Sequence, residues 1–118
     1  MSERVFRVTV RGAFDGLTEA QRAELLAEAA EHDVMSAAFT PEGHLAYDLA
    51  ARPFFTFRFL ESGEKEEDIA AAAGRAETAA ELWLVERGYG YKNVKSSAED
   101  MSKMPLAKRQ RQAQGRTA

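Results

Sequence analysis

Apolar and polar residues alternate strictly along two segments of the chain. In residues 5–11 the two classes fall on opposite sides, with Phe6, Val8 and Val10 facing away from Arg7, Thr9 and Arg11. In residues 54–60 the same pattern sets Phe55, Phe57 and Phe59 against Thr56 and Arg58. A period of two with β-branched and aromatic residues is typical of a strand with one buried face. We therefore expect two half-buried strands.

Two other segments have the period of a helix. The first begins at Thr18, an N-cap residue with Gln21 in the capping-box position, and extends to about His32. The second follows a group of acidic residues at 64–68, which suit a helix N-terminus, and should stop at Gly88. Its predicted inner stripe consists of Ile69, Ala73, Ala76, Ala80 and Trp83.

Three shorter runs complete the pattern. Residues 34–40 and 44–49 flank Pro41-Glu42-Gly43 and predict a hairpin, and residues 89–97 predict a closing strand. The order β-α-β-β-β-α-β predicts an α+β two-layer sandwich, a ferredoxin-like variant with two helices on one face of an antiparallel sheet. The standard arrangement has two strands between the helices. We expect the additional strand to be an arm at the sheet edge or part of a five-stranded sheet.

Composition indicates one domain and narrows its class. The chain has 118 residues and no cysteine, which excludes disulfides and thiolate metal sites. No apolar run approaches the roughly 20 residues that span a bilayer, and residues 1–5 lack the apolar core of a signal peptide. We therefore expect a cytoplasmic protein without membrane contact.

Charge separates the body from its C-terminus. The net charge is −3, although residues 103–118 contain five basic residues and no acid: Lys103, Lys108, Arg109, Arg111 and Arg116. Such a change of sign usually marks a tail distinct from the folded body. We predict a domain over residues 1–101 and a flexible basic tail over residues 102–118.

The strand face opposite the phenylalanines carries the candidate chemistry. Alternation places there Arg7, Arg11, Arg58, His44 and Asp48. An arginine fork matches a carboxylate or phosphate, so the three arginines are candidate ligand-binding residues. A histidine near a carboxylate can act as an acid or base, which makes His44 and Asp48 catalytic candidates. A solvated face with internally paired arginines, or a polar dimer interface, is the alternative.

Metal and cofactor sites are not expected. The two histidines have no metal-ligand spacing, and no glycine-rich phosphate loop is present. His32 lies four residues after Glu28 and suits a capping role at the helix end.

Three functions remain open. The first is a homodimeric small-molecule-binding or accessory protein that uses the polar sheet face or the cleft beside it. The second is a cofactor-free enzyme of specialised metabolism, of cyclase, isomerase or monooxygenase type. The third is a protein- or RNA-interaction module acting through the basic tail. The acidic body opposes binding of nucleic acid, and the phenylalanines are expected in the core and not on an RNA-stacking platform.

Several segments also carry a resemblance to a known family. They are FRVTVRGAFDGLT (6–18), HDV (32–34), AAFTPEG (37–43), FTFRF (55–59) and ERGYGY (86–91). Together they resemble a family of small actinobacterial proteins known only as a domain of unknown function. The resemblance covers residues 4 to about 101. It implies a self-contained domain and no particular reaction.

Overall fold

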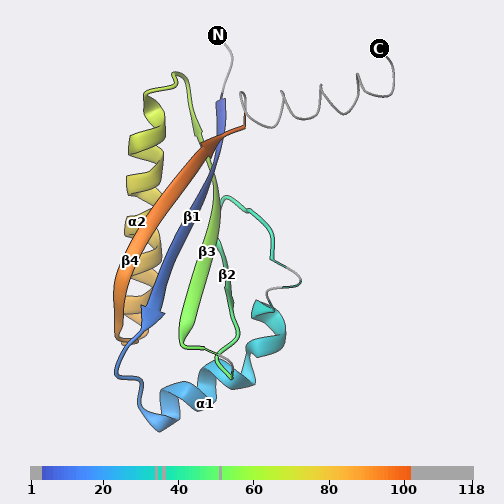
Figure 1. Cartoon of the computed structure of the whole chain (residues 1–118), viewed down its shortest axis with the longest axis vertical. Coiled ribbons are helices and arrows are strands. Elements are labelled where there is room, and N and C mark those ends of the chain that lie inside the picture. Colours follow the sequence, from blue (N-terminus) through green and yellow to red (C-terminus); the bar gives the residue numbers. More distant parts are fainter. Residues whose placement is uncertain (1–3, 34, 36, 51, 102–118) are drawn as a thin grey trace, which may run out of the picture.

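Strands and helices follow one another as β-α-β-β-α-β in the computed structural model (Figure 1). The structure describes residues 4–33, 35, 37–50 and 52–101. Its elements are β1 (Arg4–Phe14), α1 (Glu19–Ala27), the 3-10 helix η1 (Ala29–His32), β2 (His44–Tyr47), β3 (Phe54–Gly63), α2 (Asp68–Glu86) and β4 (Tyr91–Asp100). The predicted α+β class is confirmed. The predicted basic tail, residues 102–118, lies outside the described residues.

The sheet has the strand order β2-β3-β1-β4, and every neighbouring pair is antiparallel. This order, with one helix after β1 and one after β3, roughly fits the predicted ferredoxin-like arrangement. The long strands β1 and β3 occupy the centre, and β2 and β4 form the edges. The two central strands therefore contain the segments 5–11 and 54–60, for which the sequence predicted one buried and one polar face.

Two strands lie between the helices where three were predicted. Of the run 34–40, Val34 and Ser36 lie outside the described residues, and in the rest only Thr40 pairs, through an isolated bridge to Phe59. The Thr40 amide donates to the Arg58 carbonyl, and the Leu60 amide donates to the Thr40 carbonyl. The tight turn at 41–43 then leads directly into β2. In the described part of the third predicted strand, Thr40 is thus the one residue that pairs with the sheet edge.

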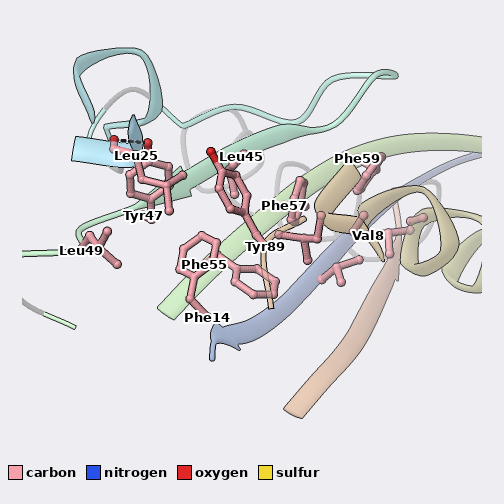
Figure 2. Packing of buried hydrophobic residues seen from close by; sticks show 14 of the residues in the cluster. Val8, Phe14, Leu25, Leu45, Tyr47, Leu49, Phe55, Phe57, Phe59 and Tyr89 are labelled. Carbon is pink, nitrogen blue, oxygen red and sulfur yellow. Dashed lines mark hydrogen bonds between the residues drawn. The ribbon is translucent and has the colours of Figure 1, made fainter. Parts of the chain in front are cut away.

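The side of the sheet that meets α2 forms the core, and we call it the inner face. Alternation is confirmed there, since the alternating residues of both central strands are almost fully buried: Phe55, Phe57 and Phe59 of β3, and Phe6, Val8 and Val10 of β1. Figure 2 shows Phe55, Phe57 and Phe59 within this cluster. The helix α2 runs along the sheet and contributes mostly alanines, which permit close approach (Figure 1). Its buried residues are Ala72, Ala76, Ala80 and Leu84, with Ile69, Ala73 and Trp83 partly buried beside them.

The helix α1 has the predicted start but a different end and position. Thr18 and Gln21 form the capping box, whereas the helix stops at Ala27 and continues as η1. It lies across one end of the sheet and not along its face (Figure 1). Its only buried residue is Leu25, whose carbonyl accepts the Tyr47 hydroxyl (Figure 2). The Tyr89 hydroxyl donates to Glu24 at 2.9 Å.

These two tyrosines give a prediction for alkaline pH. Burial first, and then the Glu28 charge, raises the pKa of Tyr47 to about 12. Burial, and then the hydrogen bond to Glu24, raises the pKa of Tyr89 to about 12. The stability tied to the neutral hydroxyls is fully present below pH 10 and is lost as pH rises toward 12.

We therefore expect the melting temperature to fall steeply between pH 10 and 12. The variant with both Tyr47→Phe and Tyr89→Phe should be less stable at pH 8, because it lacks two hydrogen bonds. Its melting temperature should nevertheless fall less steeply between pH 10 and 12. Parallel profiles for the two proteins would contradict the role of these hydroxyls.

Candidate functional site

The side of the sheet away from α2 is the outer face, and its residues lie in rows across the strands. In the central row His44 pairs with Arg58, and Arg58 pairs with Thr9. In an antiparallel pair such directly opposed residues have Cβ atoms about 4.5–5.5 Å apart. The register therefore brings His44 and Arg58, which are distant in sequence, into one site as predicted.

Two nitrogen atoms in this row are buried without a partner. They are Nε2 of His44 and Nη1 of Arg58, and neither has a hydrogen-bond partner in the described part of the chain. Buried polar atoms are almost always hydrogen-bonded, and an unsatisfied one costs about 1–3 kcal/mol. A guanidinium nitrogen can only donate. The row thus has at least one buried donor that lacks an acceptor.

The other two candidate arginines lie on either side of this row. Arg7 pairs with Leu60, and its guanidinium lies 5.0 Å from the centroid of the Phe39 ring. Arg11 pairs with Thr56. Both arginines are therefore diagonal neighbours of Arg58, at the roughly 7–8 Å separation of such positions. The structure places all three predicted ligand-binding residues on the same surface.

The outer face is positively charged although the whole chain is acidic. Besides the three arginines, Lys95 of β4 lies directly opposite Arg11. Glu99, opposite Arg7, is the one acid aligned with these three rows in β1–β4. No ion pair involves Arg7, Arg11 or Arg58 within the described residues. The alternative of internally paired arginines therefore finds no support among these residues.

Asp48 occupies a different place from His44. It follows the end of β2, is exposed, and lies four residues beyond His44, or roughly 13 Å along an extended strand. Together with Tyr47 and Asp33 it lines a separate hollow of about 320 Å³ next to α1. No hydrogen bond joins Asp48 to His44 in the described residues. Their joint catalytic role stays a prediction.

His32 contacts β2 in addition to its own helix. Its Nε2 lies 3.9 Å from the Glu28 carboxylate, as expected of a capping residue. Its Nδ1 lies 2.8 Å from the Leu45 carbonyl, and since a carbonyl only accepts, Nδ1 is the donor. The ring stacks on Tyr47, with centroids 5.2 Å apart, and lies 6.5 Å from the ring of His44. His32 therefore fixes the chain next to the central row.

Sequence reasoning missed three contributors to this surface. Phe39 was assigned to a strand, yet it covers Arg7 from an irregular segment. Lys95 and Phe54 belong to the predicted strands but were not connected with the arginines. Lys95 lies two residues from Ser97, and Phe54 lies two residues from Thr56. This alternation was a signal that could have placed Lys95 and Phe54 on the outer face.

The surface suits an anion better than a metal ion. Among the residues that the structure describes, no group of three or more potential ligands could hold a metal. The clustered arginines and buried donor instead match the oxygen atoms of a carboxylate or phosphate.

In the part of the chain that the structure describes, no helix is long and apolar enough to cross a membrane.

Comparison with known proteins identifies the family but no activity. The model of a family of unknown function, DUF6204, matches residues 1–112. No curated protein and no solved structure matches the chain. The chain therefore belongs to this family of unknown function.

Proposed function

We propose that this member of a family of unknown function is a small-molecule-binding protein that holds an anion on the outer face. Arg58 and His44 are the principal contacts. The observation that carries this proposal is the adjacent pair of buried, unpartnered nitrogens, Nη1 of Arg58 and Nε2 of His44. A carboxylate or phosphate oxygen would satisfy both atoms, with His44 donating in the tautomer that protonates Nε2.

The charges around the central row support the same ligand class. Arg7 and Arg11 are the two diagonal neighbours of Arg58 on β1, and both add positive potential around it. Thr9, opposite Arg58, supplies a hydroxyl that can donate to an anion. Interactions of an anion with partly desolvated guanidinium groups are about twice as strong as neutral hydrogen bonds. The site is thus suited to bind an anion and leaves a cation without ligands.

The other functions considered from the sequence have less support. A cofactor-free enzyme would use His44 with Asp48, and the separation of these residues gives that pair no direct contact. An interaction module would use the tail, which lies outside the described residues. Dimerisation stays a prediction, and two copies meeting through their outer faces would oppose positive charges unless an anion lay between them.

Thermal unfolding in the presence of anions tests this proposal. We expect phosphate or citrate, at constant ionic strength set with chloride, to raise the melting temperature by several degrees at ligand concentrations well above Kd. Arg58→Ala should abolish the rise, because it removes the buried donor. Arg22→Ala, which deletes the same charge from the exposed surface of α1, should retain it. An equal rise in both variants, or none in the wild type, would refute the site.

A further inference from the structure

A hollow of about 400 Å³ opens at one end of the outer face, next to the central row but outside it. It lies where β1 and β3 approach the bulged end of β4. Its lining residues are Arg11, Gly12, Ala13, Phe54, Phe55, Thr56 and Asn93. Neither His44 nor Arg58 contributes to it. The hollow therefore shares Arg11 with the surroundings of the anion site proposed above, but neither of that site's two principal contacts.

The hollow has an apolar wall. Phe54 has 54% of its surface exposed, in contrast to Phe55, which points to the core and has 1% exposed. Ala13 pairs with Phe54 in the register and adds a second apolar residue. The space between them fits the lower range of pockets that bind small molecules, about 300–1,000 Å³. An exposed aromatic ring beside such a hollow can stack on a flat ligand.

Two cations without partners in the described part of the chain lie next to the hollow, and of these Arg11 lines it whereas Lys95 does not. Arg11 and Lys95 are directly opposed in the register of β1 and β4. Like charges in this position destabilise a sheet. Neither side chain has a hydrogen bond or an ion pair among the described residues. A bound anionic group would offset this repulsion.

The backbone is shaped around the hollow. The β1–β4 register shifts between Arg11 and Ala13, and Asn93 has a φ of 59°. A non-glycine residue in this left-handed region is uncommon, although asparagine tolerates it best. A bulge of this kind re-aims side chains. The irregularity is what allows Asn93 to line the hollow, where its amide can donate to a ligand oxygen.

We propose that this hollow is a second ligand site, which takes an aromatic carboxylate. The ring of the ligand lies against Phe54 and Ala13. Its carboxylate is directed to Arg11, with Lys95 adding charge and Asn93 a hydrogen bond. This inference uses residues other than Arg58 and His44, so it does not depend on the proposed function.

Calorimetric titration of the full chain with 2-naphthoate tests this site. Two further probes separate the two contributions. The neutral isostere 2-naphthamide has the ring without the charge, and inorganic phosphate has the charge without the ring. We expect 2-naphthoate to bind, and both probes to bind at least about ten-fold more weakly in the hollow. Arg11→Ala and Phe54→Ala should each weaken binding of 2-naphthoate about ten-fold or more. Arg58→Ala lacks the principal donor of the central row, and in this variant the binding of 2-naphthoate to the hollow should remain.

The outcomes separate this site from the one on the central row. Equal binding of 2-naphthoate and 2-naphthamide, or unchanged binding to Arg11→Ala, would overturn the inference. Loss of 2-naphthoate binding in Arg58→Ala alone would also overturn it, by assigning the ligand to the central row. Absence of a phosphate response at Arg58 would refute the proposed function and leave the hollow supported. Circular dichroism of each variant confirms that the fold is retained.

Discussion

Phe55→Ala is expected to lower the free energy of unfolding by about 3–5 kcal/mol, the usual cost of removing a buried phenyl ring. Phe55 is 1% exposed and packs against Phe14 and Phe57, with ring centroids 5.0 and 5.6 Å away. Deleting the ring removes its apolar contacts and leaves a cavity in the core on the inner face of the sheet. Urea unfolding followed by circular dichroism measures the loss.

The neighbouring residue is a matched control. Phe54 is the same residue type on the same strand, but its side chain points to the outer face and is 54% exposed. Phe54→Ala should therefore cost less than about 1 kcal/mol. Equal losses for the two variants would show that the assignment of inner and outer faces is wrong. The pair thus tests the register on which both proposed sites depend.

Arg58→Leu is expected to stabilise the ligand-free protein by about 1–3 kcal/mol, the cost of a buried, unsatisfied polar group. Nη1 of Arg58 is buried and has no acceptor among the described residues. Leucine removes that donor and keeps an apolar side chain over the sheet. The same variant should lose the response to phosphate, because it lacks the guanidinium that binds the anion. The residue that favours binding at this position is thus not the one that favours stability.

A paired arginine provides the comparison. Arg75 of α2 donates from Nε to Glu61 at 3.0 Å and from Nη2 to the Ser62 carbonyl at 3.1 Å. Since this exposed arginine has partners, Arg75→Leu should destabilise the protein by up to about 1 kcal/mol. Chemical denaturation measures both changes. Destabilisation by Arg58→Leu would mean that Arg58 supports the fold, and the anion site would lose its main argument.

Local pattern was sufficient to predict the strands and their faces. Alternation in residues 5–11 and 54–60 separated core phenylalanines from outer-face arginines, as the structure has them. The capping box of α1 and the end of α2 before Gly88, whose φ is 73°, also follow from neighbouring residues. These features depend on interactions within a few residues, which a single sequence displays directly.

Tertiary contacts decided the features that pattern could not predict. Of the described residues in the expected strand at 34–40, only Thr40 finds a partner on the edge of β3. The helix α1 ends at Ala27, and hydrogen bonds from Tyr47 and Tyr89 hold it across the end of the sheet. Neither contact leaves a signal in the local sequence.

The sites show the same division. The sequence predicted that three arginines and His44 share a face, because alternation alone determines it. Pairing of His44 with Arg58, and of Arg11 with Lys95, depends on the strand register and on the bulge at Asn93. The lack of acceptors around Arg58 depends on every neighbouring element. It could be recognised only in three dimensions.

The most direct test of the anion site is a titration of the wild-type chain with phosphate, observed by nitrogen-15 NMR of side chains. The signals of the Arg58 guanidinium and the His44 imidazole should shift together with a single Kd, while those of Arg75 and Arg87 remain in place. Shifts confined to other arginines, or no saturable shift at Arg58 and His44, would contradict the account.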